Sequence, residues 1–128
     1  MASILLIEDD RALAALLIEV LEDDGHQVLL ATTGDAALAQ LAMVSPQLII
    51  ADMVLVDMLG ISVCQAIQAN PATAHIPIVI CSALKEWVIQ EQCTYAAFLA
   101  KPFDLTDLLR LVALHSLPLP LRSDGASV

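Results

Sequence analysis

Carboxylates, a hydroxyl and an ammonium group each follow directly after a short apolar run of this sequence. In chain order these residues are Glu8, Asp9, Asp10, Asp52, Ser82 and Lys101. Apolar runs of this kind are typical of strands that are buried on both faces of a parallel sheet. Open parallel sheets bind their ligands at the carboxyl ends of the strands. We therefore expect these side chains to converge at one edge of a sheet.

The residue types at this edge indicate metal and phosphate chemistry. Carboxylates that lie this close repel one another unless a cation intervenes, and oxygen ligands without histidine or cysteine suit Mg²⁺ or Mn²⁺. Ser82 and Lys101 are of the types that bind phosphoryl oxygens. Asp52 could itself attack phosphorus and form an aspartyl phosphate, whose oxygens the metal and Lys101 would neutralise. Each residue alone is more often a helix cap or a solvated side chain, so the prediction depends on their joint occurrence.

The segments that must position these groups alternate between two patterns. Runs rich in Ile, Val and Leu predict strands at 3–7, 27–31, 48–51, 78–81 and 97–100. Apolar residues at helical spacing predict helices within 13–21, 37–41, 63–67, 84–93 and 105–112. Five alternations of strand and helix predict an α/β fold with a parallel sheet and right-handed crossovers. We expect one domain over residues 1–117 and a tail or the start of a linker at 118–128.

The composition excludes several classes of protein. The chain has 128 residues, of which 59% are hydrophobic and 16% are charged, so it is not a disordered chain. Its net charge of −10 predicts no direct binding to nucleic acid or to an anionic membrane surface. Three cysteines without a C-x-x-C motif, Cys64, Cys81 and Cys93, favour reduced thiols used for packing. Without a signal-peptide pattern or a membrane-spanning stretch, we expect a cytoplasmic location.

These motifs resemble the receiver domain of two-component response regulators, from about residue 3 to residue 114. The resemblance depends on the acidic pair Asp9-Asp10, Asp52 at the end of the segment 46–52, the segment 31–38, Gly60, Ser82-Ala83 and Lys101-Pro102-Phe103. It implies a flavodoxin-like, doubly wound sheet of five parallel strands in the order 2-1-3-4-5, with five helices. It also implies that Asp52 accepts a phosphoryl group from a histidine kinase or a phosphotransfer protein.

The same resemblance implies roles for the residues around Asp52. Asp9 or Asp10, Asp52 and the backbone carbonyl of Val54 would hold Mg²⁺ or Mn²⁺. Ser82 would be the switch hydroxyl, which moves to bond the phosphoryl group. Phe98 matches the switch aromatic, although an ordinary core phenylalanine is the alternative.

The sequence also departs from the family pattern. Val56 stands where the family usually has proline, and Leu59 where it often has an acid. The segment between Ser82 and Lys101 is a few residues shorter than expected, and Thr94-Tyr95 replaces the usual Gly-Ala pair. We therefore predict a short or distorted fourth helix.

The site residues leave four hypotheses about the function. The first is a phosphorylation-controlled interaction module that catalyses only its own phosphorylation and is not a conventional enzyme. A phosphatase of the haloacid dehalogenase type would need an aspartate where Val54 stands, and a flavodoxin-like cofactor binder would need a small-residue loop in place of Glu8-Asp9-Asp10-Arg11. A degenerate receiver that serves as a scaffold or dimerisation module is the remaining alternative.

The expected partners are a phosphodonor and a downstream protein target. Apolar residues off the main stripe of the last two helices, including Trp87 and Leu114, also predict a homodimer through the fourth and fifth helices.

Overall fold

The computed structural model describes residues 2–55 and 57–116, so the predicted tail at 118–128 lies outside the described residues. Five parallel strands form one sheet: β1 (Ser3–Ile7), β2 (Gln27–Ala31), β3 (Leu48–Ala51), β4 (Ile78–Ser82) and β5 (Ala97–Ala100). Their order is β2-β1-β3-β4-β5, which confirms the predicted topology. Strand β4 includes Ser82, one residue more than the apolar run indicated.

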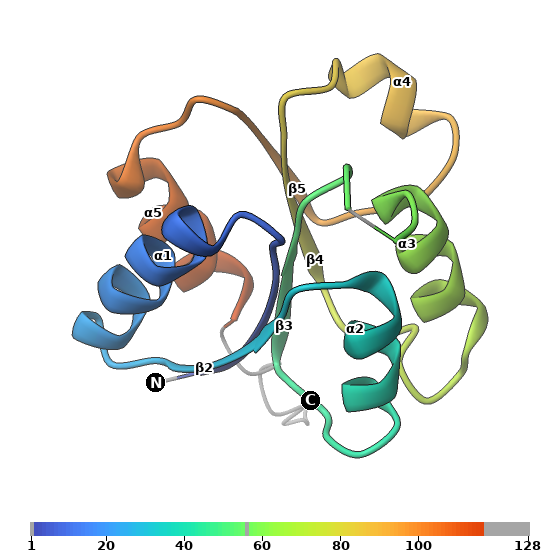
Figure 1. Ribbon diagram of the computed structural model, residues 1–128, viewed down its shortest axis with the longest axis horizontal. Helices are drawn as coiled ribbons and strands as arrows, with labels where there is room; N and C mark the ends of the chain where they lie inside the picture. Colours follow the sequence, from blue (N-terminus) through green and yellow to red (C-terminus); the bar gives the residue numbers. More distant parts are fainter. Residues whose placement is uncertain (1, 56, 117–128) are drawn as a thin grey trace, which may run out of the picture.

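Five helices connect the strands: α1 (Arg11–Asp23), α2 (Gly34–Leu41), α3 (Gly60–Ala69), α4 (Glu86–Gln90) and α5 (Leu105–His115). Helices α1 and α5 cover one face of the sheet, and α2 and α3 cover the other (Figure 1). Helix α4 has only 5 residues, so the predicted short fourth helix is confirmed.

The sheet separates two hydrophobic layers because successive residues of a strand point to opposite faces. Ile4 and Leu6 pack with Leu17 of α1 and Leu108 of α5. Leu5 and its neighbours on the other face pack against α2, α3 and α4. The central strands β1, β3 and β4 are almost entirely buried, which explains their unbroken apolar runs.

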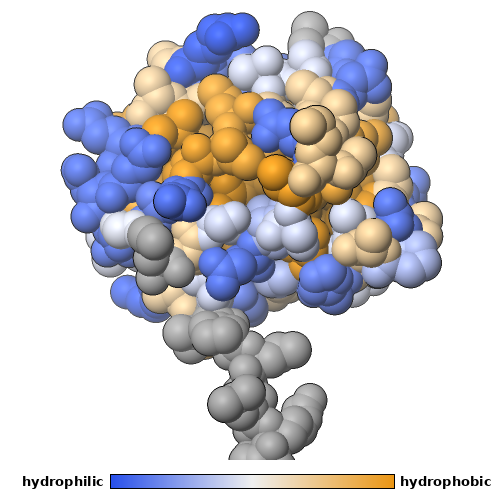
Figure 2. Space-filling model, turned by 90° about the horizontal axis from the view of Figure 1, so that it is seen from below, coloured by the Kyte–Doolittle hydropathy of each residue, from blue (hydrophilic) through white to orange (hydrophobic). Residues whose placement is uncertain are grey.

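Apolar side chains also reach the surface. Figure 2 shows one face on which they gather in a continuous area bordered by hydrophilic residues. Trp87 is 67% exposed and Leu114 is 63% exposed. Among the helices of the described residues, none combines the length and apolar character needed to cross a membrane.

The register of the strands brings their carboxyl ends to one level. Ile7 of β1 is paired with Ala51 of β3, and Ser82 of β4 is paired with Ala100 of β5. The next residue of each neighbouring strand continues the ladder: the Asp52 N–H donates to the Ile7 carbonyl, and the Lys101 N–H donates to the Ser82 carbonyl. Glu8, Asp52 and Lys101 therefore leave the sheet side by side.

Candidate functional site

Three carboxyl groups meet at this edge of the sheet. Carboxylate oxygens of Glu8, Asp9 and Asp52 all lie within 4.8 Å of one another. Glu8 is only 2% exposed and Asp52 is 8% exposed, because each follows a central strand, while Asp9 is more accessible to solvent. Three acidic groups this close form a site of strongly negative potential that a cation would stabilise.

Lys101 supplies one positive charge to this group. Its Nζ lies 3.0 Å from Glu8 Oε1 and 3.5 Å from Asp52 Oδ2. Burial raises the pKa of Glu8 by more than the hydrogen bond from Lys101 lowers it. Burial lowers the pKa of Lys101, but the hydrogen bond to Glu8 and the charge of Asp52 together raise it above its ordinary value. Lys101 is therefore a firmly protonated cation that faces the carboxyl groups of Glu8 and Asp52.

The two neighbouring acids that lie beside Asp52 are Glu8 and Asp9, whereas the predicted acidic pair was Asp9 and Asp10. Asp10 is the N-cap of α1, and its carboxylate accepts hydrogen bonds from the N–H groups of Ala12 and Leu13, each at 3.1 Å. A short carboxylate just before a helix satisfies backbone donors that have no partner inside the helix. Glu8, and not Asp10, lies with Asp9 and Asp52 in the structure. The carboxylate of Asp10 is used as a helix cap, and its predicted role as a metal ligand stays a prediction.

The backbone around Asp52 orients its carboxylate. Asp52 Oδ1 accepts a hydrogen bond from the Met53 N–H at 2.7 Å and a longer one from the Val54 N–H at 3.4 Å. The other oxygen, Oδ2, faces Lys101. Val54 lies at the rim, 52% exposed, and forms an isolated bridge with Leu59. One oxygen of Asp52 is thus held by the loop and the other points to the cation.

Gly60, the first residue of α3, allows the chain to pass directly over Asp52. A Cβ at this position would lie 2.2 Å from the Asp52 carbonyl oxygen and 2.6 Å from Met53 Cα. The Gly60 N–H also donates to the Met53 carbonyl at 2.8 Å. The glycine is therefore needed for a close approach of two backbone segments, which fixes the loop that carries Asp52.

Asp57 fixes the far end of the same loop, a role that the sequence analysis missed. Its Oδ1 and Oδ2 accept hydrogen bonds from the N–H groups of Gly34 and Asp35, at 2.8 Å and 3.0 Å. These backbone hydrogen bonds lower the pKa of Asp57. The two partners are more than twenty residues away in sequence, so no local pattern could have revealed the contact.

We expect an Asp57→Asn variant to be less stable than the parent chain at neutral pH. The amide loses the charge at the start of α2, and its NH₂ group cannot accept a hydrogen bond. Because the folded pKa of Asp57 lies below its ordinary value of 3.8, its contribution is fully present above that value and is lost as the pH falls through the folded pKa. The difference in melting temperature between the two chains should therefore narrow below about pH 4. Thermal unfolding followed across the acid range measures this, and a difference that stays constant would contradict it.

Ser82 and Phe98 lie where the switch prediction needs them. Ser82 is fully buried at the end of β4, and its Oγ accepts a hydrogen bond from the Leu84 N–H at 3.0 Å. Phe98 is paired with Ile80 in the sheet. Its ring is half-buried and meets the ring of Tyr95 at a tilted angle, with centroids 6.2 Å apart. Their roles in switching stay predictions.

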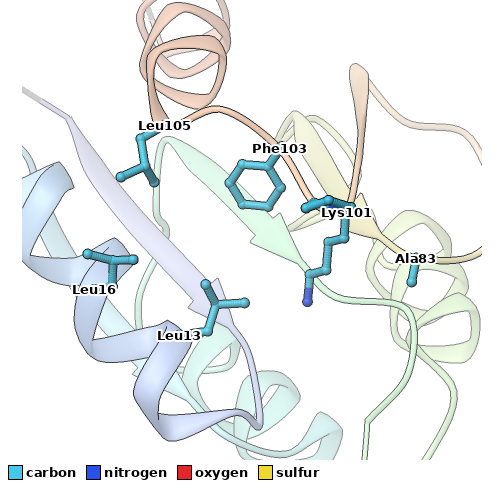
Figure 3. A pocket seen from close by; sticks show the side chains of 7 residues that line it. Leu13, Leu16, Ala83, Lys101, Phe103 and Leu105 are labelled. Carbon is cyan, nitrogen blue, oxygen red and sulfur yellow. The ribbon is translucent and has the colours of Figure 1, made fainter.

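A groove of about 600 Å³ opens beside the acidic site. It runs between α1 and the loop that joins β5 to α5 (Figure 3). Its lining is mostly apolar and consists of Leu13, Leu16, Ala83, Lys101, Pro102, Phe103 and Leu105. Lys101 thus borders both the groove and the carboxyl groups, so a molecule bound in the groove would lie next to Asp52. The helical spacing within 13–21 predicted a helix there but gave no sign of this surface.

Residues 4–113 match the response regulator receiver domain family. The doubly wound sheet with an acidic site at its carboxyl edge is the architecture of a receiver domain in two-component signalling. The chain belongs to this family.

Curated relatives and solved structures agree with this assignment. The chain is 33% identical over 117 residues to the DNA-binding dual master transcriptional regulator RpaA of Synechocystis, with 88% of this chain and 48% of RpaA covered. It is 34% identical over 119 residues to the response regulator protein FleR of Pseudomonas aeruginosa, with 91% of this chain and 25% of FleR covered. The chain thus spans half or less of the length of these relatives.

Two solved structures carry metal ions according to their descriptions. The receiver domain of the sensor histidine kinase PA1611 from Pseudomonas aeruginosa, with magnesium in its active site cleft, has a TM-score of 0.82 at 25% identity, with 90% of this chain and 97% of that one covered. The Mn²⁺-bound form of the response regulator Rcp1 has a TM-score of 0.76 at 27% identity, with 94% of this chain and 100% of that one covered.

Proposed function

We propose that Asp52 is the phosphoacceptor of this receiver domain and that a histidine kinase or a phosphotransfer protein is the donor. The observation that carries the proposal is the position of the Asp52 carboxylate. Its Oδ1 is held by the backbone of the following residues, while Oδ2 faces Lys101 inside the acidic group. An oxygen of Asp52 forms the new O–P bond as the N–P bond of the donor breaks, and the leaving nitrogen regains a proton.

The donor set fits a hard divalent cation. Asp9 and Asp52 would hold Mg²⁺ or Mn²⁺ together with the carbonyl of Val54, and Glu8 replaces Asp10 as the second acid of the pair. Oxygen donors alone are what these ions prefer, and the magnesium- and manganese-bound receiver structures support the choice. When bound, the ion supplies positive charge that neutralises the oxygens of the transferred group.

The remaining site residues have separate tasks. Lys101 places its ammonium group where charge develops on the phosphoryl oxygens. Ser82 can rotate its hydroxyl to donate a hydrogen bond to the phosphoryl group, because its Oγ otherwise only accepts one from Leu84. Phe98 is paired with Ile80, two residues before Ser82 on β4, and would follow the movement of Ser82. A local change of charge of this kind can shift the equilibrium between two conformations of a binding surface.

The test uses a small phosphodonor and intact-mass measurement. We expect phosphoramidate with Mg²⁺ to add one phosphoryl group, and a chelator to prevent the addition. Peptide mapping should place the group on Asp52. A chain that binds Mg²⁺ but never gains a phosphoryl group from any donor would favour the scaffold alternative.

Replacing Lys101 with methionine should separate its two electrostatic effects. Loss of a positioned cation at the transferred group should slow phosphorylation by phosphoramidate by roughly 100- to 1,000-fold. The same change leaves the carboxyl groups without their cation and should therefore tighten Mg²⁺ binding. The rate of phosphorylation is measured by intact mass in samples quenched at successive times. Calorimetric titration with Mg²⁺ measures the binding of the ion. A variant that loses both activities together would point to misfolding.

We propose the groove beside Lys101 as the docking surface for the phosphodonor protein. Leu16 is 45% exposed at its edge, and a charged residue there would disfavour an apolar partner. A Leu16→Glu variant should accept phosphoryl groups from a protein donor at least about tenfold more slowly, the loss expected for an interface anchor. Phosphorylation by phosphoramidate should not change. Leu29→Glu is the control, because Leu29 is 44% exposed on β2 and does not line the groove; equal effects of both variants would contradict the assignment.

A downstream protein target and a homodimer through α4 and α5 remain proposals, supported by the exposure of Trp87 and Leu114. Light scattering with and without a phosphoryl mimic tests the dimer, and a strictly monomeric mass in both states would exclude it.

The expected absence of direct nucleic-acid and membrane binding and the cytoplasmic location stay predictions. A longer protein that contains this domain could carry its own output.

A further inference from the structure

Two cysteines pack in the hydrophobic layer that α3 and α4 cover. Cys64 is buried in α3, and Cys93 lies half-buried in the segment between α4 and β5. Both pack in the same hydrophobic layer, and each thiol is close enough to change the pKa of the other. Cys93 Sγ also lies 3.9 Å from the Ile89 carbonyl.

Backbone and side-chain contacts on both sides of Cys93 hold the two segments together. Gln65 Nε2 donates to the Gln92 carbonyl at 2.7 Å. Gln68 Oε1 accepts from the Thr94 N–H at 3.1 Å, and its Nε2 donates to the Thr94 carbonyl. Residues close to Cys64 on α3 are thus hydrogen-bonded to the residues on either side of Cys93. The two segments that carry the thiols are therefore held together by neighbouring residues and not by the thiols alone.

The two thiols are not equivalent. Burial raises the pKa of both, and it raises that of Cys64 far more. The neighbouring Cys64 thiol lowers the pKa of Cys93 and so favours the Cys93 thiolate. Cys93 is also the more accessible of the two. Since the thiolate is the attacking species, Cys93 is the entering nucleophile and Cys64 is the resolving thiol.

We propose that Cys64 and Cys93 form a reversible disulfide by exchange with a small-molecule disulfide, which links α3 covalently to the segment between α4 and β5. In the first step the Cys93 sulfur attacks the external disulfide, whose S–S bond breaks, and one thiol leaves with a proton. In the second step the Cys64 sulfur attacks Cys93 Sγ, and the second thiol leaves with the proton of Cys64. The chain loses two hydrogens and the external disulfide is reduced to two thiols.

The bridge would act on the surface that carries Trp87. It adds a covalent link to the hydrogen bonds between α3 and the segment 92–94, directly after the short helix α4. Disulfides inside the reducing cytosol are usually transient and redox-sensing. The proposal is independent of phosphoryl transfer, because neither cysteine touches the acidic site.

Oxidised glutathione is the probe, and thiol counting is the measurement. After treatment of the folded chain, acid quenching and alkylation in denaturant, we expect one alkyl group in place of three, since the chain has three cysteines. Peptide mapping should show Cys64 joined to Cys93. Cys81 is the internal control, because it is buried in the other hydrophobic layer. Dithiothreitol should restore all three thiols.

Variants and conditions decide the outcome. Cys64→Ser should stop at a mixed disulfide of glutathione on Cys93, whereas Cys81→Ser should still form the bridge. Because burial raises the pKa of the thiols, the rate should increase from neutral to alkaline pH. Three free thiols after treatment at alkaline pH would overturn the proposal. A bridge that forms only in denaturant, or one that involves Cys81, would also overturn it.

Discussion

An Asp52→Asn variant is expected to gain no phosphoryl group from phosphoramidate, while its fold remains intact. The amide is not a nucleophile toward phosphorus, although its oxygen can still accept the hydrogen bond from Met53. Removal of one of three neighbouring carboxylates also relieves repulsion. The variant should therefore be at least as stable as the parent chain in the absence of metal, and it should gain less stability from Mg²⁺. Intact mass and melting temperature with and without Mg²⁺ measure these effects.

Asp10→Asn is the matched control for this experiment. Asparagine caps a helix about as well as aspartate, so the hydrogen bonds to Ala12 and Leu13 should persist. We expect normal phosphorylation and a normal response to Mg²⁺, whereas Asp9→Asn should weaken the response. An adduct that survives in Asp52→Asn at the parent level would identify another acceptor. A Mg²⁺ defect in Asp10→Asn would restore Asp10 as a ligand.

A Gly60→Ala variant should lose both stability and phosphorylation. The new Cβ would meet the Asp52 carbonyl oxygen and Met53 Cα, and neither backbone atom can rotate away. Overpacking of this kind costs about 3 kcal/mol of unfolding free energy. The loop that carries Asp52 must also shift, and a displacement of about 1 Å can slow a reaction by roughly 100-fold. Urea unfolding and the rate of phosphorylation by phosphoramidate test the two effects.

Gly25 is the control for the Gly60 substitution, because it is needed for its backbone conformation and not for a close approach. It has a φ of +93°, and a Cβ there would have no atom within 4 Å. Gly25→Ala should cost about 1 kcal/mol for the left-handed backbone alone. Its rate of phosphorylation should not change, because the turn between α1 and β2 lies at the opposite edge of the sheet from Asp52. If Gly60→Ala behaves like Gly25→Ala, the close approach over Asp52 does not control the site.

The order of elements could be read from the sequence because buried strands and amphipathic helices have different periodicities. Four of the five strands have the predicted bounds, and the remaining strand, β4, is longer by one residue, Ser82. The positions of Asp52 and Lys101 were also predictable, since both directly follow strands whose carboxyl ends must meet at one edge. The short α4 followed from the reduced spacing between Ser82 and Lys101.

The choice among Glu8, Asp9 and Asp10 was beyond the sequence, because three consecutive acids share one residue type. The end of β1 and the start of α1 place these acids differently: Glu8 accepts a hydrogen bond from Lys101, and Asp10 caps the helix. A carboxylate serves as a ligand or as a cap according to the donors around it, and those donors come from the fold.

By itself the sequence determined the alternation of strands and helices in a parallel sheet and the edge at which the polar groups converge, and the resemblance to receiver domains supplied the strand order. Only the tertiary structure showed the capping of α2 by Asp57, the groove beside Lys101 and the contact of Cys64 with Cys93. Each of these contacts joins segments that are far apart in the chain, and each depends on side-chain directions and on the packing of helices against the sheet. Periodicity along the chain reports which face a residue occupies, but it carries no information about the distant residue that it meets there.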